Sequence, residues 1–474
     1  MIRHMIRKEI LENARDGRFR WGGALVGVLL VLSLAAGWAY QQQVTEAHLG
    51  AQALSWSQWL EQGDKNPHSA AHYGIYVFRP VSTLALVDRG VDPYIGGSTW
   101  LEAHNQNPFA HRAVQDTPAM ARFADLTAAN TLQLLVPLLI LLIAFQSFTG
   151  ERERGTLRQL LSLGIDPAKL AIGKVVGVVV ALSLLLVPAG ILGALALVGT
   201  GPAGVGVRDE FARFGLLVGV YLLYFAAFAL LAVAVSAFSR SSRAALGVLL
   251  AFWILNGLVA PRVASDVARE RVVLPTSLEF RSAIQTDIAD GFGPHPARAE
   301  RQEILSDSIL SAYGVQNLEE LPINFSGISL QAGEEFANLV FDRRFGELYD
   351  RIRQQLEVHR RLAFLAPHLA VRSLSMALAG TDPEHHERYA TAAEEHRRHI
   401  QRILNEDIAQ NGQYGQTYIA GASLWSEVPE FSYEPPGIGW AIAGQGTAGA
   451  ALLFWAMLSG LVALVGAVTL PRRT

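Results

Sequence analysis

The chain has 474 residues, of which 51% are hydrophobic and 17% are charged. Soluble domains usually carry about 25% charged residues, so this composition favours an all-α membrane protein over a soluble one. The formal net charge of −3 argues against a nucleic-acid partner. The chain has no cysteine, which excludes disulfides and thiolate metal sites.

The N-terminal residues 1–20 are basic, and apolar side chains recur among them at roughly helical spacing. This pattern predicts an amphipathic cytoplasmic helix on the inner leaflet, or a simple positive anchor. Residues 21–40 follow as the first membrane span, since about 20 apolar residues cross a bilayer. A cleaved signal peptide is the rival interpretation, but its apolar core would have only about 7–15 residues. Gly23 and Gly27 could permit close helix contact within this span.

Residues 41–126 are polar and punctuated by Asn-Pro and Asp-Pro turns, which predicts an extracytoplasmic loop domain of mixed structure. The second span, residues 127–148, contains the polar residues Asn130, Gln133 and Gln146. We expect these polar groups to face other helices, because lipid offers them no hydrogen-bond partner.

The segment 149–169 has helix caps at both ends. Gly155 can end one helix, Thr156 is an N-cap candidate, and Gly164 suits a left-handed C-terminal position. Asp166 followed by Pro167 reads as the start of the next helix. The pattern predicts a helix of about two turns between two spans. Basic residues around it place it on the cytoplasmic side.

Four further spans complete the predicted topology. Gly173 and Gly177 form another small-residue pair in the third span. With six spans both termini are cytoplasmic, and the short cytoplasmic segments are basic as the charge rule requires. The remaining spans are residues 170–198, 213–238, 244–260 and 446–470.

Residues 261–445 are predicted to form an extracytoplasmic helical domain. The apolar stretch 362–379 contains charged residues and a proline, so we do not count it as a span. It could pack at the outer membrane surface or inside the external domain. The helices are expected at about residues 297–313, 333–365, 368–379 and 383–411.

Histidines in the last of these helices are weak candidates for a zinc or copper site. They lie near several glutamates, but no H-E-x-x-H motif occurs, and a solvated charged helix explains them better. We therefore expect no metal in this chain. The residues are His385, His386, His396 and His399.

Two stretches resemble known transporter sequences. Glu151–Gly164 resembles the cytoplasmic loop of type-2 ABC exporter permeases, in which a Glu-rich, Gly-Thr-Leu-containing turn forms the coupling helix that docks on the ATPase. The second stretch combines Ala366-Pro367-His368-Leu369, Leu374–Asp382 and His385-His386-Glu387. It resembles the subfamily of these permeases that has a large helical insert of unassigned function before the sixth span.

The first resemblance implies a set of ATPase-coupling residues. Leu157, Leu160 and Leu161 share one helix face, and we expect them to dock in a groove of the ATPase, because so short a turn has no core of its own. Glu151 and Glu153 are expected to pair with basic groups there. The full set is Glu151, Arg152, Glu153, Arg154, Gly155, Thr156, Leu157, Arg158, Leu160 and Leu161.

The resemblance implies a membrane permease subunit of an ABC exporter in the inner membrane of a bacterium. The chain has no G-x-x-x-x-G-K-[ST] motif, so ATP and Mg²⁺ are expected on a separate ATPase subunit and no cofactor or catalytic residue is expected here. Six spans are half a transporter, so a second permease subunit, the same chain or a paralogue, is implied. The alternative is an ATPase-driven transmitter of conformational change to an extracytoplasmic protein without solute transport.

Overall fold

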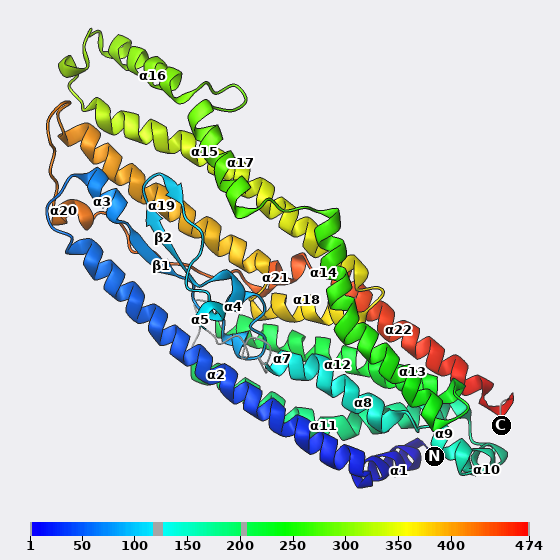
Figure 1. The fold of residues 1–474 in the computed structure, drawn as a ribbon. Coiled ribbons are helices and arrows are strands. Elements are labelled where there is room, and N and C mark those ends of the chain that lie inside the picture. The colour runs from blue at the N-terminus through cyan, green and yellow to red at the C-terminus, as the bar shows by residue number, and fades with distance from the viewer. Residues whose placement is uncertain (1, 117–126, 201–205, 473–474) are drawn as a thin grey trace.

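The computed structural model of the protein describes residues 2–116, 127–200 and 206–472. The chain is mostly helical, and six helical segments are long and apolar enough to cross a membrane. They form a bundle at one end of an elongated molecule, where both termini lie (Figure 1). We call this end the basal end, and the part of the chain that extends beyond the bundle the distal domain. The predicted all-α membrane fold with six spans is confirmed, apart from one small sheet.

The spans differ in how continuous their helices are. The second and fifth each contain a π-helical turn shortly before a proline, Pro137 or Pro261, which accommodates the missing backbone N–H. The six spans are α2 (Gly17–Leu60); α7 (Ala128–Asn130), η2 (Thr131–Leu135), α8 (Val136–Ala144) and α9 (Thr149–Glu153); α11 (Pro167–Thr200); α12 (Val207–Phe238); α13 (Ser242–Ile254), η3 (Leu255–Val259) and α14 (Ala260–Arg271); and α22 (Gly446–Thr469).

Helix α2 is much longer than the predicted first span. Its 44 residues make a helix of about 66 Å, roughly twice the thickness of the hydrocarbon core. Residues 41–60 were expected in a loop, but they contain no proline and only one glycine, Gly50, and the helix continues through them. Near its distal end Trp59 is fully buried and donates a hydrogen bond from Nε1 to the carbonyl of Trp425 at 3.0 Å.

Segments 41–126 and 261–445, expected as two separate extracytoplasmic domains, share one hydrophobic core. Strands β1 (Ile75–Phe78), β2 (Ser98–Glu102) and β3 (Asn105–Gln106) form an antiparallel sheet in that order. The sheet and α3 (Pro67–Tyr73) pack against α19 (Pro383–Asn411). Their common core contains Trp59, Val77, Leu101, Tyr389, Leu404 and Trp425.

The other distal elements lie on or between these. Helix α17 (Phe325–Leu362) runs beside α19, and α15 (Ser277–Asp290) packs on α17 through a small core of its own (Figure 1). The expected helix at 333–365 thus begins earlier, whereas those at 297–313 and 383–411 have nearly the predicted bounds.

The chain also contains several further helical elements. They are η1 (Thr83–Leu86), α4 (Asp92–Ile95), α5 (Ala113–Asp116), α16 (Arg298–Tyr313), η4 (Leu318–Glu320), α20 (Ala422–Trp425), α21 (Ile438–Ala443) and η5 (Leu470–Arg472).

Helix α18 (Pro367–Ala379) packs into the bundle itself. Its residues Leu369, Leu374 and Leu378 belong to the same hydrophobic core as the spanning helices. This is neither of the two placements that the sequence left open. Spanning helices surround α18 where the bundle meets the distal domain, and this explains why its apolar composition resembles that of a span.

A chain of buried polar groups fixes α18 in this position. Ser375 donates to Asp88 Oδ2 at 2.5 Å, and its Oγ lies 2.9 Å from the hydroxyl of Tyr221. That hydroxyl accepts a hydrogen bond from Gln133 Nε2 at 3.1 Å. Gln133 therefore faces other helices as predicted, and it connects the second span to the distal domain through three side chains. Such a network stabilises one arrangement because each member would be costly to leave unpaired.

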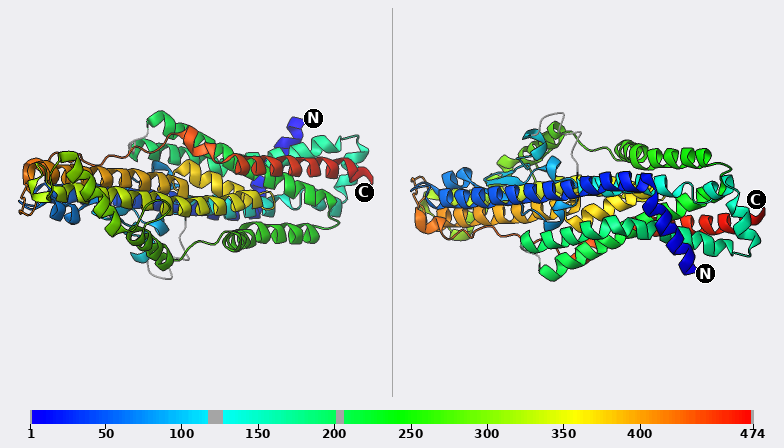
Figure 2. Two further views of the ribbon diagram at one scale, coloured as in Figure 1. Left: turned by 90° about the horizontal axis from the view of Figure 1, so that it is seen from above. Right: turned by 90° about the horizontal axis from the view of Figure 1, so that it is seen from below.

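Helix α1 (Ile2–Arg15) lies against α11 in close backbone contact. A Cβ atom at Gly173 would lie 3.1 Å from Met5 Cβ, and one at Gly177 would lie 2.5 Å from Glu9 Cβ. The small-residue pair predicted in the third span therefore allows α1 to approach α11 closely. Figure 2 shows α1 turned away from the long α2 at the basal end.

We expect Gly177→Leu to displace α1, because the new side chain cannot fit against Glu9. Overpacking of this kind costs about 1–3 kcal/mol. Limited trypsin digestion of the detergent-purified protein should then cleave faster after the arginines and the single lysine of α1. Gly190→Leu is the matched control, because a Cβ atom at Gly190 on the same helix meets nothing within 4 Å. Equal digestion of the two variants would contradict this packing.

Candidate functional site

The segment between the second and third spans forms a capped helix at the basal end. Helix α10 (Thr156–Ser162) follows Gly155, whose φ of 74° allows the chain to reverse after α9. Gly164 has a φ of 73°, and Asp166 caps α11 by accepting from the Ala168 N–H at 2.9 Å. The structure therefore contains the predicted two-turn helix between two glycines.

Thr156 does not have the predicted capping role. Gly155 occupies the N-cap position, and the Thr156 hydroxyl donates instead to the carbonyl of Glu151 at 3.2 Å. Because Gly155 has left-handed backbone geometry, the helix begins one residue earlier than a threonine cap would require. Thr156 thus holds α10 to α9 instead of satisfying a free N–H group.

The leucine stripe of α10 is largely buried within the protein, which corrects its prediction as a docking face. Leu157 is fully buried in a core with Phe148, Leu170, Val233 and Leu470. Leu160 and Leu161 pack against the same core and are partly buried. The prediction assumed that so short a turn has no core of its own, but the basal ends of the spanning helices supply one. A substitution such as Leu160→Asp would therefore disturb the permease itself.

Glu151 is buried in an ion network, which corrects its expected role as a partner-facing charge. Its Oε1 accepts from Lys174 Nζ and from Lys8 Nζ, both at 2.9 Å. Lys174 also donates to Glu9 Oε1 at 3.0 Å, and only 2% of its side chain is exposed. Buried charges persist only when they are paired. The network joins α1, α9 and α11, three helices whose relative position it therefore fixes.

Lys8 is the most accessible member of this network, with 44% of its side chain exposed. Partial burial lowers its pKa, but the carboxylates of Glu151, Glu9 and Glu12 outweigh this effect and raise the pKa above its usual value. Lys8 therefore stays charged at physiological pH. Its ammonium group and that of Lys174 together neutralise Glu151 and Glu9.

Arg152 and Glu153 connect α9 to the turn between α12 and α13. Arg152 donates to the carbonyls of Ser239 and Ala237 at the end of α12, at 2.5 and 3.1 Å. Glu153 accepts from the backbone N–H of Ser242 at 2.7 Å and from its hydroxyl at 2.9 Å. Each charge thus lies at the helix end whose dipole it complements. Glu153 is also exposed, so its expected pairing with a partner stays a prediction.

The surface that α10 leaves exposed consists of other residues. Leu163 is 77% exposed although it is a large apolar side chain, and it lies directly after α10. Arg154, Arg158 and Lys169 lie around it and are also exposed. Sequence reasoning missed Leu163 because it lies off the leucine stripe. Its position just before Gly164 could have indicated this exposure, because Gly164 predicts the end of a surface helix there.

The four histidines named as weak metal candidates do not form a cluster among the described residues. His385 Nδ1 lies 2.6 Å from Asp382 Oδ1, and His386 packs on Phe109 with ring centres 4.4 Å apart. Burial, together with the nearby Arg79, lowers the pKa of His386 to about 3. The interpretation as a solvated charged helix is therefore wrong for His385 and His386, which are buried, whereas His399 is exposed.

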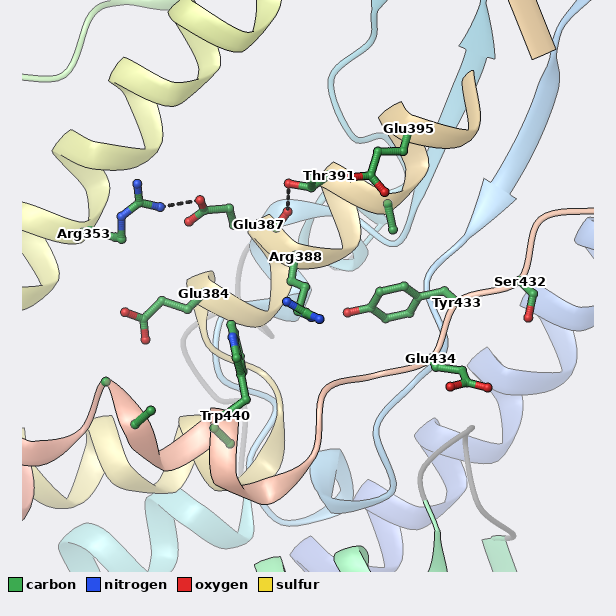
Figure 3. A pocket seen from close by; sticks show the side chains of 14 residues that line it. Arg353, Glu384, Glu387, Arg388, Thr391, Glu395, Ser432, Tyr433, Glu434 and Trp440 are labelled. Atoms are coloured by element: carbon green, nitrogen blue, oxygen red, sulfur yellow. Dashed lines mark hydrogen bonds and ion pairs between the residues drawn. The ribbon is translucent and has the colours of Figure 1, made fainter. Parts of the chain in front are cut away.

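A pocket of about 610 Å³ lies in the distal domain between α17, α19 and the segment that leads into α21 (Figure 3). Arg353 pairs with Glu387 across it, and the Arg388 guanidinium lies 5.5 Å from the ring centre of Trp440. Two of the four acidic side chains in the lining are paired with arginines, Glu387 with Arg353 and Glu384 with Arg360. The charged lining residues are Arg353, Glu384, Glu387, Arg388, Glu395 and Glu434.

Comparison with known families gives two matches, each covering about a third of the chain. Residues 103–263, which include α7 to α13, match the model of the ABC-2 family transporter protein. This match supports an ABC-2 type permease. Residues 277–434 match a domain of unknown function, DUF3526. No curated protein matches the chain. With the six apolar helices, the first match supports an integral membrane permease subunit of an ABC transporter.

We expect Glu151→Gln to lower the free energy of unfolding by about 1–3 kcal/mol, because Lys174 loses one of its two buried carboxylate partners and keeps only Glu9. The double variant Glu151→Gln/Lys174→Gln should lose less unfolding free energy than the two single variants lose together, since each single substitution already removes the ion pair. Chemical unfolding in mixed micelles measures all three.

Glu12→Gln is the control for this cycle, because the Glu12 carboxylate is exposed and lies 3.4 Å from Lys8. Loss of the Glu12 charge should lower the free energy of unfolding by less than about 1 kcal/mol. Strict additivity of the Glu151 and Lys174 substitutions would show that the pair does not hold the helices together.

Proposed function

We propose that the chain is the membrane permease subunit of an ABC exporter and that a separate ATPase docks on its basal end. The match to the ABC-2 family transporter protein supports the permease assignment. The observation that carries the docking proposal is the capped helix α10, which is anchored by Leu157 and presents Leu163 outward. ATP and Mg²⁺ would be bound by the partner subunit.

The contacts of α9 and α10 explain how a docked ATPase would drive the bundle. The turn at Gly164 and Asp166 passes a displacement of α10 directly into α11. Glu151 passes it to α1 through Lys8, and Arg152 passes it to the end of α12. Because these contacts are buried or charge-assisted, the connected helices would move together rather than separately.

The proposed orientation places the basal end in the cytoplasm and the distal domain outside. Basic residues gather in the short basal segments, as the positive-inside rule requires. The basal end carries Arg158 in α10, Arg154 and Lys169 beside it, Arg240 in the turn after α12 and Arg243 at the start of α13.

The bundle also has apolar surface for a second permease subunit. Only 28% of the residues in the most apolar stretch of α11 are buried within the chain. Ile172, Leu184 and Leu195 are each more than half exposed on this helix. Lipid or a second six-span subunit, the same chain or a paralogue, would cover this face. Two such subunits would enclose the transport pathway in this proposal.

Cysteine labelling tests the orientation against a clean background, because the native chain has no cysteine. In intact cells, we expect an impermeant thiol reagent to label Ser308→Cys, an exposed position on α16, but not Ser162→Cys on α10. Both positions should react after permeabilisation. Ser242 is a poor reporter, since its hydroxyl is buried against Thr149 and Glu153. Labelling of Ser162→Cys in intact cells would overturn the topology.

We expect Leu163→Asp to leave the permease folded but to weaken ATPase binding at least about tenfold, because a charge replaces a central apolar contact. Co-purification of the ATPase and its permease-dependent hydrolysis measure the effect. Leu278→Asp is the matched control, because Leu278 on distal helix α15 is 79% exposed. If Leu163→Asp binds the ATPase as tightly as Leu278→Asp, then α10 is not the docking site.

Transmission of force to an external partner is the second candidate function. It is favoured by α2, one uninterrupted helix from the basal end to the buried Trp59 of the distal domain. Movement of the basal end of α2 would therefore be delivered far outside the membrane. Solute accumulation in proteoliposomes that contain permease and ATPase distinguishes the two functions, because a transmitter would hydrolyse ATP without moving a solute.

A further inference from the structure

Three histidines from two separate segments meet on the surface of the distal domain. His68 and His72 lie one turn apart on α3, and His104 lies in the turn between β2 and β3. One ring nitrogen of each lies within 4.8 Å of the others. The ring centres are 4.7 to 5.1 Å apart. From this geometry we propose that His68, His72 and His104 bind a divalent transition-metal ion of the zinc and copper class.

The backbone holds the two segments together independently of any ion. Asn66 caps α3 by accepting from the His68 N–H at 2.9 Å, and Pro67 occupies the first turn. The Ala103 N–H donates to the carbonyl of Ala71 at 3.0 Å, which places the β2–β3 turn beside α3. The histidine cluster therefore lies on a preformed frame, and a bound ion would not need to order it.

His104 is held in an orientation suited to metal binding. Its φ is 65°, an uncommon backbone conformation for a residue other than glycine. Glu334 maintains it by accepting from the His104 N–H at 2.8 Å, and its Oε1 lies 2.6 Å from His104 Nδ1. A proton on Nδ1 leaves the Nε2 lone pair available. Metal-binding histidines commonly have such a carboxylate on the second ring nitrogen.

Glu334 is itself fixed by a buried charge network. Arg397, which is 1% exposed, donates to Glu334 Oε2 at 3.0 Å and to both carboxylate oxygens of Glu394 at 2.8 and 2.9 Å. Both carboxylate oxygens of Glu334 thus have a partner, Oε1 at His104 and Oε2 at Arg397.

Imidazole nitrogens suit metal ions of this class. Neutral imidazoles are the ligands that Zn²⁺, Cu²⁺ and Ni²⁺ accept. His72 and His104 are exposed, so an ion held by the three rings would keep a position open to water or another ligand.

Zinc titration of the full chain tests the site. The protein should be purified in detergent with a histidine-free tag, stripped with a chelator, and titrated with Zn²⁺ against a chromogenic competitor. We expect one tight equivalent, and at least a tenfold loss of affinity in His72→Ala and in His104→Ala. Both residues are exposed, so these variants should remain folded. Co²⁺ should give the visible absorption of a low-coordinate nitrogen site in the unmodified protein alone.

Two further variants sharpen the test. His399→Ala is the matched control, because His399 is an exposed histidine on α19 outside the cluster, and it should bind Zn²⁺ like the unmodified chain. Glu334→Gln keeps its shape but loses its charge, and should weaken binding by about 10–100-fold. Unchanged affinity in His72→Ala and His104→Ala, or no tight equivalent in the unmodified chain, would overturn the proposal. The readout is metal binding alone, so it is independent of the proposed ATPase partner.

Discussion

The arrangement of the basal end depends on one requirement, that the charges of Glu151 and Lys174 be buried together. Neither group could be removed from water alone, because desolvation of a single charge costs several kcal/mol. Since Glu151 belongs to α9 and Lys174 to α11, the second and third spans must meet at this point. Glu9 and Lys8 extend the same requirement to α1. The short helix α10 lies between the two spans and inherits this rigidity.

A charge is also buried together with its counter-charges at the far end of the molecule. Arg397 of α19 is almost fully buried and is compensated by Glu394 of the same helix and by Glu334 of α17, so its pair with Glu334 holds the two helices together. Between the two ends, α18 and its polar contacts fasten the distal domain into the bundle. The protein is therefore a continuous structure from the basal end to the distal core. The distal domain is not a loosely tethered insertion.

Both proposed functions use this continuity in different ways. An exporter would use the basal contacts to move spanning helices around a pathway, with the distal domain fixed to the outer end through α18. A transmitter would use α2 and α19 to carry the same movement outward. The histidine cluster lies on the distal frame near Glu334, where an ion would connect α3, the β2–β3 turn and α17.

The sequence by itself determined the features that depend on neighbouring residues. The number of spans, the two-turn helix between Gly155 and Gly164, and the helix from Pro383 to Asn411 followed from hydrophobic runs and capping residues. These signals act within a few residues, so they can be read locally. Even the apolar character of α18 was visible, although its place was not.

Only the tertiary structure decided which groups meet. Leu157 is buried by residues as distant as Leu470, and Glu151 is paired with Lys8, so both were wrongly expected to face a partner. His68 and His104 gave no local pattern, because their meeting depends on the pairing of β2 with its neighbours and on Glu334 far along the chain. Burial and charge pairing are set by contacts between distant segments, and no local pattern of residues specifies those contacts.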